Sequence, residues 1–197
     1  MRILIAEDDP VIALALAERV RSLGHEPLGP VGDGEQAVAE AAATGPDLYL
    51  FDVEMPKLDG LAAAAELTAR GLGRPVVVIT GVDDRGLIER SVATGAGAYL
   101  TKPVDTRELE AAISLAAARH AELEGVQAEL AQTKQTLEER KIIERAKGLL
   151  MKVLGLAEPD AFRRLQLAAR ERNLRLVDVA RVIVEQQDIL ESPAAKK

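Results

Sequence analysis

The chain has 197 residues, of which 48% are hydrophobic and 2% aromatic, and its formal net charge is −7. Aliphatic side chains and alanine can therefore build a packed core, which excludes a disordered chain. The absence of cysteine excludes disulfides and thiolate metal sites, and it favours a cytoplasmic location. Acidic residues follow the first apolar run too early for a signal peptide, and we expect no membrane-spanning helix.

The charge is distributed unevenly along the chain. Residues 1–136 hold 12 Lys+Arg and 22 Asp+Glu, a net of −10, whereas residues 137–190 hold 11 and 9, a net of +2. We interpret the acidic front and the mildly basic back as two domains with different tasks. The basic excess is too small to indicate nucleic-acid binding by itself.

Short apolar runs alternate with helical patterns in the first 120 residues. The runs predict strands at residues 2–6, 26–30, 48–51, 75–79 and 98–100. Helices are expected after Asp9-Pro10, Asp33-Gly34 and Asp59-Gly60, around Leu87, Ile88 and Val92, and from about Asp105. This order of elements predicts an α/β fold with a doubly wound, five-stranded parallel sheet.

The rest of the chain has a helical pattern throughout. Residues 105–154 contain no proline, and leucine or alanine recurs every seven residues at Leu109, Ala116, Leu123, Leu130 and Leu137. This is half of a coiled-coil seam, and it is compatible either with a dimer stem or with a helix that packs on its own domain. Gly155 and Asn173 separate three helical segments, which predict a small three-helix bundle, and residues 191–197 are expected to be a disordered tail.

Polar residues end or follow four of the predicted strands. They are Glu7 and Asp8, then Asp52, Thr80, and Lys102 before Pro103. Because the carboxyl ends of parallel strands meet at one edge of a sheet, we expect these residues to form one pocket. Crowded carboxylates repel one another, and a hard divalent cation such as Mg²⁺ relieves that repulsion.

The expected pocket has the groups that phosphoryl transfer requires. Asp8, Asp52 and the Glu54 backbone carbonyl can ligate Mg²⁺, and Glu7 can hold one of its waters. A free oxygen of Asp52 is then the nucleophile, while the Lys102 ammonium and the Thr80 hydroxyl meet the phosphoryl oxygens. A cis peptide at Lys102-Pro103 would aim the lysine inward.

The segments IAEDD, FDVEMPKLDG, ITG and AYLTKP, in this order, resemble the receiver domain of two-component response regulators. The resemblance covers residues 1–120 and implies a flavodoxin-like fold. It also implies that Asp52 accepts a phosphoryl group from a histidine kinase, and that Thr80 and Tyr99 move together as a switch. Glu7 stands where many members have aspartate, and its longer side chain can still hold a metal-bound water.

The segment RKIIERAKGLLM, followed by Ala161-Phe162 and by residues 176–183, resembles the ANTAR domain. The resemblance covers residues 137–190 and implies binding of paired RNA stem-loops, as a dimer, to prevent transcription termination. Residues 121–136 are then a helical linker. The candidate RNA-binding residues are the cations Lys141, Arg145, Lys147, Lys152, Arg163 and Arg164.

Two local features qualify this picture. Gly148 lies inside a helix, where glycine costs about 1 kcal/mol against alanine, so we expect something to pack closely there. A neighbouring helix is the first explanation, and close approach by RNA is the second. Ala157 stands where a Ser or Thr helix cap would be expected before Glu158-Pro159.

Three hypotheses follow for the output of the chain. The leading one is an RNA-binding antiterminator gated by phosphorylation, which catalyses no reaction other than its own phosphorylation and dephosphorylation. The second is a DNA-binding regulator with a hidden helix-turn-helix, although the third helix of the bundle offers only Arg175 and Arg181 as cations. The third is a relay whose helical end binds another protein.

Overall fold

The computed structural model describes residues 1–81 and 96–191, with side chains described as far as residue 186. The chain divides into two compact units, Met1–Gly125 and Val126–Lys197, so the division falls within the predicted linker. Among the described residues, no helix is both long and apolar enough to cross a membrane. The predicted helix around Leu87, Ile88 and Val92 lies outside the described residues, as does nearly all of the predicted tail.

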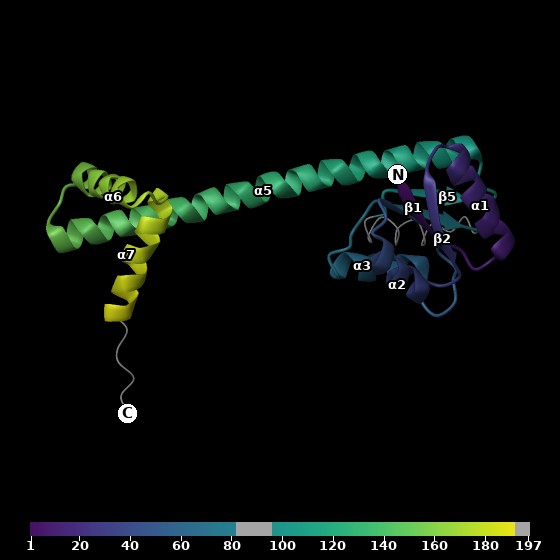
Figure 1. Ribbon diagram of the computed structural model, residues 1–197, viewed down its shortest axis with the longest axis horizontal. Helices are drawn as coiled ribbons and strands as arrows, with labels where there is room; N and C mark the ends of the chain where they lie inside the picture. Colours follow the sequence, from purple (N-terminus) through teal and green to yellow (C-terminus); the bar gives the residue numbers. More distant parts are fainter. Residues whose placement is uncertain (82–95, 192–197) are drawn as a thin grey trace, which may run out of the picture. The chain divides into compact units, whose positions relative to one another are not determined.

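The first unit contains the predicted parallel sheet (Figure 1). Its strands are β1 (Arg2–Ala6), β2 (Glu26–Val31), β3 (Leu48–Asp52), β4 (Val76–Thr80) and β5 (Ala98–Thr101). They are ordered β2-β1-β3-β4-β5, and every neighbouring pair is parallel. The predicted doubly wound α/β fold is therefore confirmed.

Helices cover both faces of this sheet. They are α1 (Pro10–Ser22), α2 (Gly34–Thr44), α3 (Gly60–Ala69) and the first turns of α5 (Thr106–Leu154). Alternate side chains of each strand point to opposite faces, so Ile3 and Ile5 pack with α1 and α5, whereas Leu4 packs with α2 and α3. Burial on both faces explains why β1, β3 and β4 are continuous apolar runs, whereas the edge strands β2 and β5 are partly exposed.

Aspartates begin three of the helices, as the sequence predicts. Asp9 Oδ1 accepts hydrogen bonds from the backbone N–H groups of Val11 and Ile12, at 2.8 and 3.2 Å. Asp33 and Asp59 cap α2 and α3 in the same way. Each cap satisfies N–H groups that the first helical turn leaves without partners, and it fixes where the loop after the preceding strand ends.

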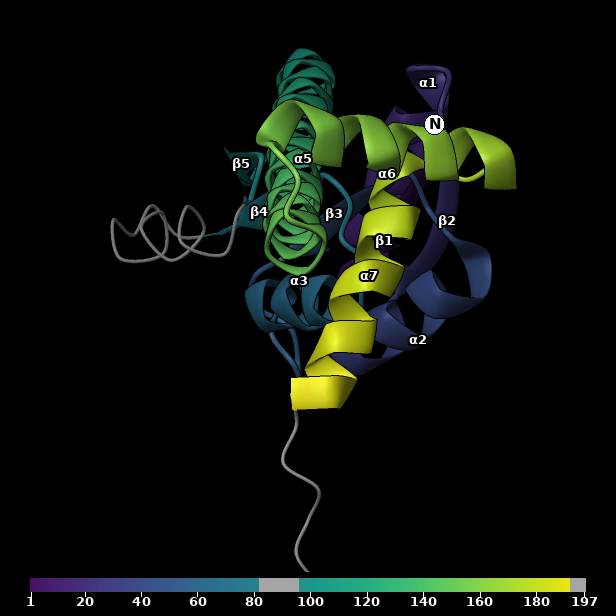
Figure 2. The same ribbon diagram turned by 90° about the vertical axis from the view of Figure 1, so that its left-hand side faces the viewer.

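The second unit is a small helical bundle (Figure 2). The end of α5 packs with α6 (Glu158–Arg172) and α7 (Leu176–Glu191) around Ala146, Leu165 and Ala180. Gly155 and Asn173 adopt the left-handed conformation that reverses the chain between these helices, with φ of 64° and 51°. Ala157 begins α6 without a side-chain cap, as its sequence indicates.

The seven-residue pattern of α5 changes its environment along the helix. Leu109 and Ala116 are fully buried in the first unit, so this part of the pattern packs on its own domain. Leu123, Leu130 and Leu137 are 57%, 53% and 52% exposed. The predicted dimer stem is therefore confined to these later positions, and it stays a prediction.

The prediction that a neighbouring helix packs closely against Gly148 is wrong. A Cβ atom built on this glycine would meet no atom within 4 Å outside its own helix backbone. The neighbouring helices pack on the opposite side of α5, against Ala146, Leu149 and Leu150. The glycine is exposed, and no described part of the chain requires its small size.

Candidate functional site

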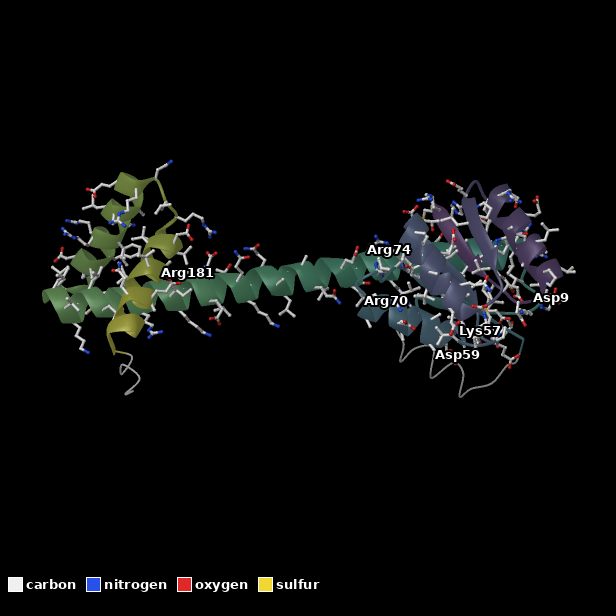
Figure 3. All side chains as sticks on the ribbon, turned by 60° about the horizontal axis from the view of Figure 1, so that its bottom comes forward. Asp9, Lys57, Asp59, Arg70, Arg74 and Arg181 are labelled. Atoms are coloured by element: carbon white, nitrogen blue, oxygen red, sulfur yellow. The ribbon has the colours of Figure 1, made fainter. Side chains whose placement is uncertain are left out.

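The candidate site lies at the carboxyl edge of the sheet. Glu7 and Asp8 follow β1, Asp52 ends the adjacent β3, Thr80 ends β4, and Lys102 follows β5. The strand order reverses between β1 and β3, and open α/β sheets form their binding crevice at such a point. Asp9, Lys57 and Asp59 mark this end of the unit in Figure 3, with Arg70 and Arg74 at the other end.

An ammonium group connects the two buried carboxylates of the site. Lys102 Nζ lies 2.7 Å from Asp52 Oδ2 and donates a 3.0 Å hydrogen bond to Glu7 Oε1. It also makes a 2.8 Å ion contact with Glu7 Oε2. Glu7 and Asp52 are only 2% and 3% exposed, so the ammonium offsets two charges that water reaches poorly. The Lys102-Pro103 peptide is cis, as predicted.

Burial and mutual contact shift the pKa values of Glu7 and Lys102. Burial raises the pKa of Glu7, and the nearby Asp52 carboxylate adds to that rise, although Lys102 opposes both. Burial alone would lower the pKa of Lys102, but its hydrogen bonds to Asp52 and Glu7 prevail and raise it. Lys102 therefore stays a cation when carboxylate charge is present beside it.

The acidic residues fit a hard divalent cation. Carboxylate oxygens of Glu7, Asp8 and Asp52 lie within 4.8 Å of one another. Asp52 Oδ1 is buried and has no hydrogen-bond donor among the described residues, so it can accept a ligand without losing a partner. Oxygen ligands with one exposed side, here at Asp8, suit Mg²⁺, which keeps several waters. The Glu54 carbonyl as a further ligand stays a prediction.

The two predicted switch residues differ in exposure. Thr80 is 2% exposed at the end of β4, and Tyr99 on β5 is 40% exposed. The strands pair so that Val78 lies opposite Tyr99 and Thr80 opposite Thr101. Thr80 directly follows Ile79, the residue of β4 that pairs with Asp52, while Tyr99 lies on the edge strand β5. Their coupled movement stays a prediction.

Sequence reasoning missed an ion pair beside the site. Lys57 Nζ donates a 2.6 Å hydrogen bond to Asp33 Oδ2, which links the loop after β3 to the start of α2. The hydrogen bonds from Lys57 and the Gln36 backbone lower the pKa of Asp33 to about 2. Lys57 has a φ of 63°, and no spacing rule brings residues 33 and 57 together. The segment FDVEMPKLDG is singled out by its resemblance to a receiver domain, which does not indicate this contact.

The second unit presents most of the candidate RNA-binding cations at its surface. Lys141, Arg145, Lys152, Arg163 and Arg164 are all exposed. Lys141 Nζ donates a 2.6 Å hydrogen bond to Glu138 Oε1, and both side chains are exposed on α5. These five positions therefore remain candidates for contact with phosphate.

Lys147 differs from the other five candidates, and the structure corrects our prediction of a surface role. It is 8% exposed, and its Nζ lies 2.9 Å from Glu144 Oε2 and 2.7 Å from Glu158 Oε1. The same nitrogen lies 5.8 Å from the centre of the Phe162 ring. The hydrogen bonds to Glu158 and Glu144 raise the pKa of Lys147. Lys147 thus joins α5 to α6, and we remove it from the candidate RNA surface.

One of the two cations predicted for the third helix is also engaged within the bundle, and it lies just before α7. Arg175 donates a 2.7 Å hydrogen bond from its guanidinium to Glu139 Oε1 on α5. Arg181 is exposed and is labelled in Figure 3. A recognition helix needs several side chains free to reach base edges, so this arrangement disfavours the helix-turn-helix hypothesis.

Known families match both units. Residues 3–114 match the response regulator receiver domain, and residues 131–184 match the ANTAR domain. The chain is a response regulator with a receiver and an ANTAR domain. It is similar to the transcriptional regulatory protein PdtaR of Mycobacterium tuberculosis, with 44% identity over 93% of this chain and 89% of that protein.

Two of the similar solved structures each cover about three fifths of this chain. The receiver domain of a modulated diguanylate cyclase from Desulfovibrio desulfuricans has 35% identity and a TM-score of 0.56, covering 62% of this chain and 97% of that one. A DNA-binding response regulator of the LuxR family from Staphylococcus aureus has 27% identity and a TM-score of 0.55, covering 58% and 97%. Receiver domains thus serve outputs of different kinds, and the output of this chain must be argued from its ANTAR domain.

Proposed function

We propose that this response regulator accepts a phosphoryl group on Asp52 from a histidine kinase, and that phosphorylation gates RNA binding by its ANTAR domain to prevent transcription termination. The observation that carries the proposal is the cluster in which Lys102 bridges Asp52 and Glu7 beside Asp8. This cluster combines a buried nucleophile, a fixed cation and a set of oxygen ligands.

The chemistry assigned to Asp52 is a simple group transfer. A carboxylate oxygen of Asp52 forms a bond to phosphorus, and the phosphorus–nitrogen bond of the kinase phosphohistidine breaks, which returns the electron pair to the imidazole. Mg²⁺, held by Asp8, Asp52 and a water on Glu7, would supply positive charge to the phosphoryl oxygens. Lys102 would move its hydrogen bond from Asp52 to those oxygens, and Thr80 would donate its hydroxyl to one of them.

The RNA-binding role rests on the ANTAR match and on the surface of its bundle. Five exposed cations on α5 and α6 offer phosphate contacts, and their arginine planes can stack on unpaired bases. The exposed leucines of α5 support a dimer that would bind two stem-loops at once. In this proposal the chain catalyses only its own phosphorylation and dephosphorylation, and it acts in the cytoplasm.

Two measurements on the full chain test this proposal. Incubation with a small phosphoryl donor and Mg²⁺ should add the mass of one phosphoryl group to the unsubstituted chain and none to Asp52→Asn. A tandem-hairpin RNA should bind more tightly than duplex DNA of equal length at two salt concentrations. Preference for the duplex would favour a DNA-binding regulator, and absence of nucleic-acid binding at both concentrations would favour a protein partner.

A further inference from the structure

Gly148 is an uncovered glycine in the middle of a long helix. It is exposed on α5, and a Cβ atom there would meet nothing within 4 Å. Glycine in a helix interior costs about 1 kcal/mol relative to alanine. Since no described neighbour needs the space, the isolated fold does not account for this cost.

Cations surround the uncovered backbone on the same helix face. Lys141 lies seven residues before Gly148, Arg145 lies three before it, and Lys152 lies four after it. At helical spacing these three cations and the glycine share one side of α5. All are exposed, and they lie opposite the face whose Ala146 is buried in the bundle. The nearest acidic residue, Glu144, already accepts hydrogen bonds from Lys147.

We propose that the sugar–phosphate backbone of bound RNA crosses α5 directly over Gly148, between Arg145 and Lys152. The inference deepens the proposed RNA-binding function and rests on it. The helix N–H groups are already bonded within α5, so the phosphates are held by the flanking cations rather than by the main chain. The missing side chain lets the strand lie close enough for both cations to reach it.

A second copy of the chain fits this surface less well than RNA does. If the exposed stripe at Leu130 and Leu137 continued to the bundle, the next equivalent position would be Glu144. Arg140 occupies the companion position of the same repeat. A parallel pair of helices would then place like charges opposite each other, whereas phosphate is complementary to the cations.

The chain contains a matched control for this inference. Gly125 is also an exposed glycine within α5 and also has nothing within 4 Å. The residues three before it and four after it are Glu122 and Glu129, where Gly148 has Arg145 and Lys152. Alanine at either glycine should therefore stabilise α5, but only Gly148→Ala should obstruct an RNA strand.

The test is a titration of the full-length variants with a tandem-hairpin RNA. Gly148→Ala should raise the melting temperature and weaken RNA binding about tenfold, and Gly148→Leu should weaken it further. Gly125→Ala should raise the melting temperature and bind RNA like the unsubstituted chain. Gly148→Ala should keep the salt dependence of binding, whereas Lys152→Ala should reduce the slope of log K against log salt by about 1.

The outcomes separate the inference from the function on which it rests. If the unsubstituted chain and Gly125→Ala bind RNA, equal affinity for Gly148→Ala overturns the inference and leaves the RNA-binding function standing. A change in molar mass of Gly148→Ala without RNA would assign the surface to a second copy and would also overturn it. If the unsubstituted chain binds no RNA, the function itself fails.

Discussion

At the scale of single residues, Lys102 holds the most consequential position in the receiver. It neutralises part of the charge of Asp52 and Glu7, which are both buried. Removing one member of such a group leaves charge without compensation. The same lysine is proposed to meet the phosphoryl oxygens, so stability and chemistry depend on one side chain.

This position gives a prediction for Lys102→Met. The substitution should lower the free energy of unfolding by on the order of 2 kcal/mol. This is less than the loss expected for a fully buried ion pair, because the Lys102 side chain is 21% exposed. Added Mg²⁺ should recover more stability in this variant than in the unsubstituted chain, because a cation would replace the lost ammonium. Urea denaturation with and without Mg²⁺ measures both effects. An equal gain in the two proteins would contradict replacement of the ammonium by the cation, and no gain in either protein would contradict a cation site at these carboxylates.

A second residue-scale prediction concerns Asp33 and Lys57. The pKa of Asp33 is lowered from 3.8 to about 2, so its contribution to stability is present above pH 4 and is lost as the pH falls towards 2. Lys57→Asn, which keeps a residue tolerant of positive φ, should return the pKa of Asp33 towards its ordinary value. An NMR titration of the Asp33 carboxyl measures this shift. An unchanged titration in the variant would show that Lys57 does not hold the carboxylate.

The third prediction concerns Lys147 and keeps Lys141 as its control. Lys147→Met should lower the melting temperature of the ANTAR bundle, because Glu144 and Glu158 lose their common partner and Phe162 loses its cation contact. Lys141→Met should leave that temperature nearly unchanged, since the Lys141 side chain is 70% exposed. Thermal unfolding followed by circular dichroism compares the two. Equal effects would contradict an internal role for Lys147.

At the scale of elements, close contact between α3 and β3 fixes the loop that follows Asp52. A Cβ atom on Gly60 would lie 2.0 Å from the Asp52 carbonyl oxygen, which is impossible without movement of the strand or the helix. Gly60→Ala should therefore lower the free energy of unfolding by roughly 1–3 kcal/mol and slow phosphorylation of Asp52. Gly32→Ala is the control, because a Cβ atom there meets nothing within 4 Å. Denaturation and phosphorylation rates of both variants provide the comparison.

The elements also show what the sequence could predict. The positions of β1, β3 and β4 followed from continuous apolar runs, and helix starts followed from aspartates such as Asp9 and Asp33, because both signals are local. The convergence of Glu7, Asp52 and Lys102 followed from strand topology, which places successive strand ends at one edge. These predictions needed no knowledge of individual side-chain contacts.

Other features depended on contacts between elements distant in sequence. The sequence alone predicts that Lys147 is a surface cation, but α6 places Glu158 Oε1 2.7 Å from its Nζ. The sequence alone predicts close packing at Gly148, but the bundle packs on another side of α5. The Asp33–Lys57 pair joins two loops whose separation in sequence carries no periodic signal. In each case the deciding fact is which face of an element its neighbours cover.

At the scale of the whole molecule, the chain joins an acidic receiver to a mildly basic ANTAR domain through one helix, α5. Phosphorylation of the receiver can regulate the ANTAR domain only if it changes the free energy of RNA binding. Such coupling requires that the phosphorylated state and the RNA-bound state favour the same conformation or assembly. Dimer formation through the exposed leucines of α5 would provide that link.

The central claim is that chemistry at Asp52 controls RNA binding by the ANTAR domain. The most direct test is the affinity of the full chain for a tandem-hairpin RNA with and without beryllofluoride and Mg²⁺, with molar mass measured on the same samples. We predict a roughly 5- to 150-fold gain in affinity on activation, accompanied by dimer formation and absent in Asp52→Asn. An affinity that is the same in both states, or a gain that Asp52→Asn retains, would contradict the claim.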